Sequence, residues 1–500
     1  MNSLEVRKIF LNYFSEKKHK LVPSASVVPN NDPTLLFTNA GMTQFKDVFL
    51  GAETLDFSRA TSAQKCIRAG GKHNDLENVG YTLRHHTFFE MLGNFSFGDY
   101  FKEDAIEYAW DLLINHYKLS KDKLWVTVHI EDQESEKIWL EKIGLDKKRI
   151  SKLNEDNFWS MGDTGPCGPC SEIFYDHGDS LEGSPPEEGK DTGDRFVEIY
   201  NIVFMQFNRD IEGNLKPLPK PSVDTGMGLE RISAVMQGTP DNYQTDLFIP
   251  LIKKISELTG EKDLLNPSLR VIADHLRASC FMISDGIAIG NEGRNYVLRR
   301  IIRRALRHAY KLNSENFYVM SKLAIYFSDT YKELYPEIEK NNSFIEKALH
   351  EEEEKFGATL NQGMSLLDEE VKKLKGKVIS GDLAFRLYDT FGFPLDMTID
   401  FARENNLNVD IEEYEKLMDL QKTRAKESNT FSSLLPSSIE VDGDTNFVGY
   451  DESESKSTIK MIFKDGKRVS KIDGGESAIL FDATPFYAES GGQVGDTGNI

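Results

Sequence analysis

Two short stretches of this sequence carry residues suited to phosphate chemistry, and the first of them is cationic. The segment from Gln64 to Phe97 has β-prone ends around a loop whose basic and imidazole side chains are Arg68, Lys72, His73, Arg84, His85 and His86. Cations held on rigid strands can neutralise the charge that develops when a phosphate is transferred. Phe88 and Phe89 offer an aromatic face for a base. Taken alone, the segment fits a basic surface hairpin better.

The second stretch, SVDTGMGLER from Ser222 to Arg231, reads as a strand that runs into a helix. Gly226 and Gly228 let a ligand approach the backbone N–H groups at the positive end of that helix. Asp224 could accept a hydrogen bond from an amine, and Arg231 could reach a terminal phosphate. The alternative is an ordinary strand-to-helix turn with a surface arginine. Neither GxxxxGK[ST] nor GxGxxG after a strand occurs, so any nucleotide is bound in another way.

A third stretch, from Phe158 to Asp176, is rich in glycine and proline and holds Cys167 and Cys170. Such a pair can be half of a zinc site or a redox pair. His177 follows closely, but no fourth ligand stands at a suitable spacing, and structural zinc sites are nearly always four-coordinate. The sequence therefore favours a structural Gly-Pro-Cys loop over a metal site.

The elements that must position these residues are mostly strands up to about residue 225. A helix is predicted over residues 4 to 14, and mixed short strands and turns follow. Apolar, β-rich runs predict strands over Phe196 to Phe207 and over Lys220 to Asp224.

From Pro240 to about Lys426 the pattern is almost wholly helical. One long helix is marked by an apolar stripe from Ile345 to Leu374, and its acidic run Glu351 to Glu354 is expected to face solvent. Ser432 to Ser438 reads as a linker. An Asp465-Gly466 hairpin signal then opens a β-rich segment that resembles the start of a further domain.

Length and composition indicate a globular protein of about three domains, at about 150 residues each. The chain has 500 residues, of which 39% are hydrophobic and 28% charged. No run approaches the roughly 18 apolar residues of a membrane helix, and no signal peptide is recognisable, so we expect a cytoplasmic protein that does not enter a membrane. Four cysteines are too few for a disulfide framework.

The net charge of −21 argues against a nucleic-acid partner, but its distribution reverses that expectation. Arg294 to Lys311 contains six arginines and no acid. At about 100° per residue, its apolar residues fall on one helical face, and the opposite face carries Arg299, Arg300, Arg303, Arg304 and Arg307. This face predicts either a phosphate-backbone contact strip or a set of arginines paired with the surplus acids of the protein.

Six segments together resemble the alanyl-tRNA synthetase family, over almost all of residues 1 to 310. They are PTLLFTNAGMTQFKDVFLG (33 to 51), RAGGKHNDLENVGYTLRHHTFFEMLGNFSFGDYF (68 to 101), MGDTGPCGPCSEIFYDHG (161 to 178), NIVFMQFNR (201 to 209), PLPKPSVDTGMGLER (217 to 231) and LRVIADHLRA with YVLRRIIRRALRH (269 to 308). The resemblance implies an α+β fold, with a class II antiparallel sheet flanked by helices over 1–237. A helical domain for the tRNA acceptor stem over 238–431 and an incomplete β-barrel or editing region over 439–500 are also implied.

The resemblance also implies site residues. The catalytic residues would be Arg68, Lys72, Asp75 and Arg231, and ATP would contact Arg68, Phe89, Gly228 and Arg231. The alanine pocket would comprise Trp159, Asn201, Val203, Asp224, Gly226 and Met91. The implied reaction is attack of the alanine carboxylate on the α-phosphate of ATP, with Mg²⁺, followed by transfer of alanine to tRNA(Ala). Positioning and charge neutralisation suffice for such a step.

For tRNA, the resemblance implies that Asn291 and Asp389 read a G·U pair in the acceptor stem, and it favours tRNA contact for the arginine-rich face. The family's editing domain contains a zinc site, and the ligands of that site do not occur here. We therefore expect neither editing nor zinc binding. The family's oligomerisation segment is not recognisable either, so we expect a monomeric amino-terminal fragment. Two alternatives are an adenylating enzyme of the same fold that loads a carrier other than tRNA and a non-catalytic RNA-binding paralogue. Arg68, Asp224 and Arg231 argue against the paralogue, because all three are present.

Overall fold

The protein divides into two compact units in a computed structural model. The structure describes residues 1–29, 35–70, 73–374, 376–428, 445–449, 452, 454–464, 467–487 and 496–500. One unit comprises Met1–Lys373 with Leu387–Glu404, and the other Leu374–Arg386 with Asn405–Ile500. Among the described residues, no helix is both long enough and apolar enough to cross a membrane.

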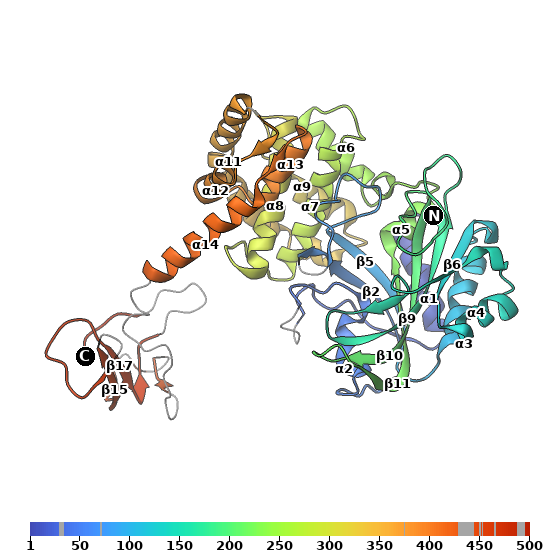
Figure 1. Ribbon diagram of the computed structural model, residues 1–500, viewed down its shortest axis with the longest axis horizontal. Coiled ribbons are helices and arrows are strands. Elements are labelled where there is room, and N and C mark those ends of the chain that lie inside the picture. Colours follow the sequence, from blue (N-terminus) through green and yellow to red (C-terminus); the bar gives the residue numbers. More distant parts are fainter. Residues whose placement is uncertain are drawn as a thin grey trace. The chain divides into compact units, whose positions relative to one another are not determined.

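A nine-stranded sheet forms the core of the first unit (Figure 1), with the order β1-β2-β5-β11-β10-β9-β6-β7 and β8 paired to β9. Its strands are β1 (Lys20–Leu21), β2 (Arg59–Ile67), β5 (Phe88–Ser96), β6 (Leu124–His129), β7 (Ile150–Leu153), β8 (Phe158–Ser160), β9 (Gly165–Asp176), β10 (Phe196–Arg209) and β11 (Leu215–Gly228). The central strands from β2 to β6 pair antiparallel, whereas β1 and β7 pair parallel at the two edges. The predicted antiparallel core is therefore confirmed.

The stretch from Phe158 to Asp176, which is rich in glycine and proline, contains β8 and the long strand β9. Its Gly-Pro-Cys residues lie in β9, so the prediction of a loop is wrong. The stretch can pair because β9 lies between β10 and β6, and its apolar side chains are buried on both faces of the sheet. The second predicted strand is also longer than its apolar run, since β11 begins at Leu215.

Helix α1 (Ser3–Glu16) covers part of one face of the sheet, in contact with β2, β5 and α5 (Leu229–Met236). It begins with a capping box in which Asn2 and Glu5 bond each other's backbone N–H groups. Its buried face carries Val6 and Phe10. Burial of this apolar stripe holds the helix on the sheet.

Helices dominate the chain after residue 240, as predicted. In the first unit they are α6 (Ile249–Thr259), α7 (Pro267–Ser284), α8 (Gly293–Leu312), α9 (Met320–Tyr331), α10 (Pro336–Lys340), α11 (Asn342–Lys373) and α13 (Leu395–Glu404), and shorter helices α2 (Lys46–Phe49), α3 (Lys102–Asp111) and α4 (Gln133–Lys137) precede them. Helix α12 (Gly381–Phe391) contains Asp389. The apolar stripe of α11 is buried against α9, α8 and α7, which confirms the long helix.

The acidic run on α11 does not lie wholly in solvent, and that prediction is wrong for its two middle residues. Glu352 and Glu353 are buried. The Glu353 carboxylate accepts hydrogen bonds from the backbone N–H of Ser321 and from its hydroxyl, and so caps α9. Burial of this carboxyl group is tolerated because its oxygens accept hydrogen bonds.

The second unit contains α14 (Ile411–Ser428) and short strands. These are β12 (Val378–Ile379), β13 (Asn408–Val409), β14 (Asn446–Phe447), β15 (Ile459–Lys464), β16 (Lys467–Val469), β17 (Ala478–Phe481) and β18 (Ala483–Thr484). Strands β15 and β16 pair antiparallel on either side of the predicted hairpin turn, whose Asp465 and Gly466 lie outside the described residues. The predicted linker Ser432 to Ser438 also lies outside them.

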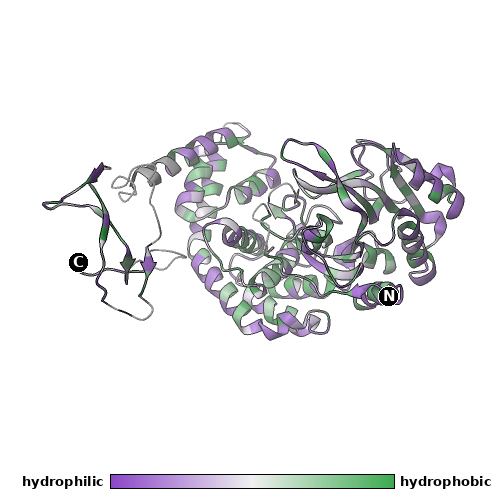
Figure 2. Cartoon of the chain, turned by 90° about the horizontal axis from the view of Figure 1, so that it is seen from below, coloured by the Kyte–Doolittle hydropathy of each residue, from purple (hydrophilic) through white to green (hydrophobic). Residues whose placement is uncertain are grey.

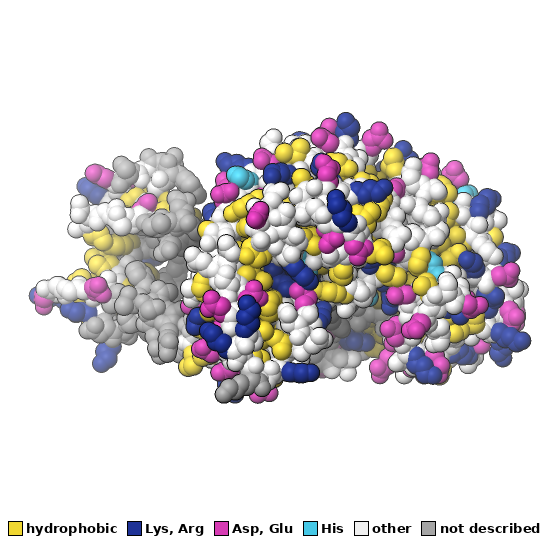
Figure 3. Space-filling model, turned by 90° about the horizontal axis from the view of Figure 1, so that it is seen from above, with side chains coloured by type: hydrophobic (Ala, Val, Ile, Leu, Met, Phe, Trp, Pro, Cys, Tyr) yellow, Lys and Arg dark blue, Asp and Glu magenta, His cyan; other side chains and the backbone are white. Residues whose placement is uncertain are grey.

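Hydropathy and charge are distributed as expected for a globular chain. Hydrophobic residues gather on the sides of helices and strands that face their neighbours (Figure 2). On the face drawn in Figure 3, acidic and basic side chains are interspersed. The net negative charge is therefore not gathered into one acidic field on that face.

Candidate active site

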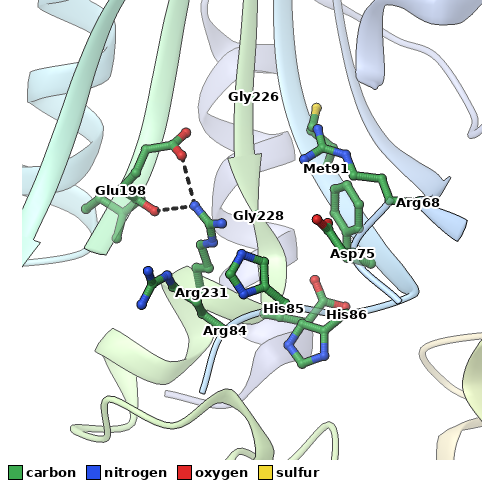
Figure 4. A pocket seen from close by; sticks show the side chains of 13 residues that line it. Arg68, Asp75, Arg84, His85, His86, Met91, Glu198, Gly226, Gly228 and Arg231 are labelled. Atoms are coloured by element: carbon green, nitrogen blue, oxygen red, sulfur yellow. Dashed lines mark hydrogen bonds and ion pairs between the residues drawn. The ribbon is translucent and has the colours of Figure 1, made fainter. Parts of the chain in front are cut away.

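A pocket opens on one face of the sheet, where β5, β10 and β11 meet the start of α5. It is lined by Arg68, Asp75, Arg84, His85, His86, Phe89, Met91, Glu198, Ile199, Gly226, Gly228, Glu230 and Arg231. Figure 4 shows Arg231 and Glu198 on one side, and Arg68, Asp75 and Met91 on the other, with β11 between them. The pocket thus unites the two stretches that the sequence singled out for phosphate chemistry.

Strand register explains why these residues share a face. Side chains alternate along a strand, so Asp224, Gly226 and Gly228 point to the same side of β11. Directly opposite partners share a face as well: Val203 pairs with Asp224, and Asn201 with Gly226. Asp224, Asn201 and Val203 therefore lie on the same face of the sheet as Gly226 and Gly228, which line the pocket.

The phosphate side of the pocket contains Arg68, which follows β2. Its guanidinium lies 5.0 Å from the centroid of the Phe89 ring, and its Nε donates to the carbonyl of Asn39 at 3.4 Å. The Asp75 backbone N–H donates to the Arg68 carbonyl at 3.2 Å, which fixes Asp75 beside it. Lys72, predicted in the same loop, lies outside the described residues.

Arg231 lies on the first turn of α5 and is held by Glu198. Its Nη1 donates to the Glu198 backbone carbonyl at 3.0 Å and to the Glu198 carboxylate at 2.9 Å (Figure 4). Glu198 is not among the residues predicted from the sequence. A β-bulge at Ile199 shifts the register between Glu198 and Tyr200, so Glu198 pairs with Phe174. This shift turns its side chain to the pocket face.

Asp224 is buried and lacks a partner for one carboxylate oxygen. Its Oδ1 accepts no hydrogen bond from the described residues. Burial raises the pKa of Asp224 well above its usual value, and no cation in the described part of the chain offsets this effect. A buried carboxylate of this kind gains most from a ligand that brings an ammonium group.

The predicted amino-acid pocket adjoins Asp224. Val203 belongs to a buried apolar cluster, and Met91 and Trp159 pack against that cluster. A Cβ atom at Gly226 would come within 3.0 Å of the Met91 sulfur, so a glycine at this position keeps space open next to Asp224. Asn201 donates from Nδ2 to Glu172 at 2.9 Å. The surface beside Asp224 is therefore small and mostly apolar.

His85 and Arg84 line the pocket too, but they differ in charge. Burial and the nearby arginines lower the pKa of His85 to about 4, so its ring is neutral near pH 7 and is not one of the cations counted from the sequence. Arg84 donates to the Gly193 carbonyl at 2.9 Å and to the Asp194 carboxylate at 2.7 Å. Among the described residues, the phosphate side therefore takes its positive charge mainly from arginines.

Two carboxylates, Glu172 and Glu198, lie on the pocket side of neighbouring strands and could help to hold a divalent cation. Burial, and then the charge of Glu198, raises the pKa of Glu172 well above its usual value. A cation between them would relieve this repulsion. Mg²⁺ commonly binds one or two carboxylates together with substrate phosphates. This donor set fits that pattern, although no cluster of three or more metal-binding side chains occurs in the described part of the chain.

The arginines of α8 do not form the exposed basic face that was predicted. Arg304 and Arg307 are buried, and their ion pairs with Asp400 and Glu404 measure 2.6 and 2.7 Å. Arg300 pairs with Asp396 at 2.9 Å, and Arg303 and Arg299 contact Glu352 at 2.7 and 3.5 Å. The alternative, arginines paired with surplus acids, is the arrangement observed. It arises because α13 presents Asp396, Asp400 and Glu404 at four-residue spacing along α8.

The two residues predicted to read a base pair are both exposed. Asn291 precedes α8, where its side chain contacts Arg299, and Asp389 lies near the end of α12.

Cys167 and Cys170 are buried in β9. Burial raises the pKa of both thiols, which keeps them protonated and poor metal ligands.

Sheet and pocket together have the character of a class II tRNA synthetase, and sequence comparison agrees. The family "tRNA synthetases class II (A)" matches residues 5–500, and the chain belongs to this family. It is 57% identical over 502 residues to the alanine–tRNA ligase of Hydrogenovibrio crunogenus and 55% identical over 500 residues to that of Idiomarina loihiensis, in both cases over 100% of this chain. The chain spans 58% of the length of these relatives.

Among solved structures, the chain is similar to the pyrrolysyl-tRNA synthetase from Desulfitobacterium hafniense. That similarity has a TM-score of 0.24 and 13% sequence identity, and it covers 49% of this chain and 72% of that one.

Proposed function

We propose that this chain activates L-alanine with ATP and transfers it to the 3′ end of tRNA(Ala). The observation that carries the proposal is the position of Asp224. A buried carboxylate with an unpaired oxygen lies on the same face of β11 as Gly226 and Gly228, which line the pocket together with Arg68 and Arg231, and its strand partner Val203 belongs to a buried apolar cluster. This arrangement suits a small amino acid on one side and a polyphosphate on the other.

ATP would bind across the pocket. The Phe89 ring, already in contact with Arg68, would stack on adenine, and Arg68 would face the α-phosphate. Arg231 would face the γ-phosphate, close to Gly228, where the missing side chain allows near approach of the backbone. Two fixed cations at the ends of the triphosphate would hold it in one orientation.

Alanine would bind with its ammonium group on Asp224. The ion pair would offset the free-energy cost of burying that carboxylate. Val203, Trp159 and Met91 would surround the methyl group, with Gly226 and Asn201 beside the main-chain atoms of the substrate. A pocket of this kind rejects larger side chains by exclusion, whereas a near-isostere such as serine is rejected by only about a hundredfold.

The chemical step is a displacement at phosphorus that uses no nucleophile from the protein. The alanine carboxylate oxygen bonds to the α-phosphorus, and the bond to the bridging oxygen breaks as pyrophosphate departs with its electron pair. Arg68 and Arg231 stabilise the charge on the phosphates in the transition state. Mg²⁺ from Mg·ATP, held by Glu172 and Glu198, would neutralise further phosphate charge when bound.

The tRNA would then accept the alanyl group on its terminal ribose hydroxyl, which displaces AMP. Asn291 and Asp389 are the exposed candidates for contact with the acceptor stem. The buried Arg304 and Arg307 are not proposed as tRNA contacts. Three other arginines of α8 are half-buried and ion-paired: Arg299, Arg300 and Arg303. Any contact that they make with tRNA would therefore come from side chains that are already paired with acids.

Charging of a tRNA(Ala) transcript with radiolabelled alanine tests the proposal. The purified chain should form alanyl-tRNA in the presence of ATP and Mg²⁺, and replacement of the G·U pair in the acceptor stem should reduce the rate. Adenylate formation without any charging would favour a different acceptor for the activated amino acid. No activation of any amino acid would exclude catalysis by this chain.

A further inference from the structure

The segment from Asp75 to Thr87, here called the pocket segment, is contacted by helices of the first unit. It supplies Asp75, Arg84, His85 and His86 to the pocket. Residues 75 to 86 contain no strand and no helix. Their positions therefore depend on contacts with neighbouring elements.

Helix α7 contacts both the end and the middle of this segment. Both carboxylate oxygens of Asp274 accept from the Thr87 backbone N–H, at 3.0 and 3.2 Å, and Asp274 also lies 3.3 Å from His86 Nδ1. Gly80 has a φ of +88°, and a Cβ atom there would come within 2.4 Å of the Val271 side chain. The segment thus packs directly on α7, at a distance that only glycine permits.

Asp274 is joined to α8 through His275. The two side chains are 3.0 Å apart, at His275 Nδ1, and Arg304 Nη1 lies 3.0 Å from His275 Nε2. Because a guanidinium can only donate, Nε2 must accept, and the ring proton lies on Nδ1 and faces Asp274. Burial alone would raise the pKa of Asp274, but the bonds from His275 and His86 hold it well below its usual value.

Arg304 also reaches the pocket segment itself. The same Nη1 donates to the Leu76 carbonyl at 2.9 Å, and Nε donates to Asp400 at 2.6 Å. Leu76 follows Asp75 directly. Helix α13 adds two further contacts, from Arg403 to the Glu77 carbonyl at 3.2 Å and from the Tyr81 hydroxyl to Glu404 at 3.4 Å.

We propose that Arg304 is a positioning residue for amino-acid activation: through Leu76, and through His275 and Asp274, it holds the Asp75–Thr87 segment in the geometry that binds ATP. This inference rests on the proposed function, because the activity to be measured is amino-acid activation. It reverses the role that the sequence favoured for Arg304, since a tRNA contact would affect charging alone, whereas a positioning residue affects activation without tRNA.

Two variants separate positioning from stability. Arg304→Gln removes the cation, whereas Arg304→Lys keeps a charge opposite Asp400 but lacks the planar fork that reaches Leu76 and His275 together. Lys102→Gln is the matched control, because Lys102 is a buried cation on α3 with a 2.7 Å ion pair to Asp132 and makes no contact with the pocket segment. Each variant is tested for its Kd for ATP by calorimetry, for alanine-dependent ATP–pyrophosphate exchange without tRNA, and for its melting temperature.

We expect both Arg304 variants to raise the Kd and the KM for ATP by about tenfold or more, since about 1 Å of misplacement can cost a hundredfold. Lys102→Gln should change either constant by less than about threefold, as distant sites act independently. Arg304→Lys should keep most of the thermal stability, so it decides the matter if Arg304→Gln does not fold.

Wild-type constants in Arg304→Lys, or equal changes in Lys102→Gln, would overturn the inference. If the wild-type chain binds ATP but exchanges pyrophosphate with no amino acid, the proposed function fails, and the ratio of the ATP Kd values still tests Arg304. If the wild-type chain does not bind ATP, both proposals fail.

Discussion

Arg231 donates from one guanidinium nitrogen to both the backbone carbonyl and the carboxylate of Glu198, at 3.0 and 2.9 Å. Its remaining donors can face a ligand in the pocket without loss of this anchor. The arginine is thus oriented in advance, which is how a fixed cation becomes effective in catalysis.

Replacement of Arg231 by lysine should reduce kcat/KM for ATP by about a hundredfold, because one oriented donor is typically worth that much. Lysine cannot make the two bonds to Glu198 and still present a planar set of donors. Steady-state pyrophosphate exchange over a range of ATP concentrations measures the effect. Near-wild-type kinetics would show that Arg231 does not face a phosphate.

Glu198→Gln should leave the backbone anchor of Arg231 in place and weaken the apparent affinity for Mg²⁺. The variant keeps a side-chain oxygen acceptor but removes the charge that it would share with Glu172. The Mg²⁺ concentration for half-maximal exchange should rise, by about tenfold if one charge-assisted contact of about 1.4 kcal/mol is lost. An unchanged Mg²⁺ dependence would exclude Glu198 as a ligand.

Asp224→Asn should reduce kcat/KM for alanine by about a thousandfold, because loss of one partner of a buried ion pair costs about 3 to 5 kcal/mol. The Kd for ATP should change little, since the contacts proposed for ATP do not involve Asp224. Equal losses for both substrates would indicate misfolding instead.

The same variant should be more heat-stable than the wild type at pH 8 without ligand. The raised pKa of Asp224 means that its ionisation costs folding free energy, so its stabilising contribution is present at low pH and is lost as the pH rises through the folded-state value. The difference in melting temperature should therefore be smaller at pH 5 than at pH 8, because the ionised form that burial disfavours is less favoured at the lower pH. Calorimetric scans at the two pH values measure it, and a constant difference would contradict the assignment of the raised pKa.

Acid should destabilise the fold through two buried histidines, His19 and His308. Burial lowers their pKa values to about 4 and about 3. Because the unfolded chain protonates them near pH 6.5 and the folded chain does not, stability is full above about pH 6.5 and falls as the pH drops toward 4, by up to about 1.4 kcal/mol per pH unit for each group. His308→Gln should flatten this dependence in melting curves between pH 7 and 4.5, and an unchanged slope would assign it to other groups.

Local periodicity predicted the long helix and two strands of the sheet, whereas the antiparallel sheet and most of the pocket residues were implied by the resemblance of contiguous motifs to a known family. The sequence did not reveal Glu198, since strict alternation from Asn201 and Val203 places that residue on the opposite face, and only the bulge at Ile199 brings it round. A bulge has no dependable signature in a single sequence.

The buried arginines of α8 could not be predicted for a different reason. An arginine-rich helical face looks the same whether it meets RNA or an acidic helix, and the partner residues Asp396, Asp400 and Glu404 stand about 100 residues later in the chain. Only the packing of α13 on α8 decides between the two. The acids at Glu352 and Glu353 escaped prediction likewise, because charge runs on helices usually face solvent.

Pyrophosphate exchange into ATP, measured with the purified chain and each of the twenty amino acids without tRNA, tests the central claim most directly. We predict strong exchange with alanine, weak exchange with glycine and serine, and loss of the alanine signal in Asp224→Asn. A folded, ATP-binding chain that shows no exchange with alanine, or alanine exchange that survives in Asp224→Asn, would contradict the assignment of this pocket.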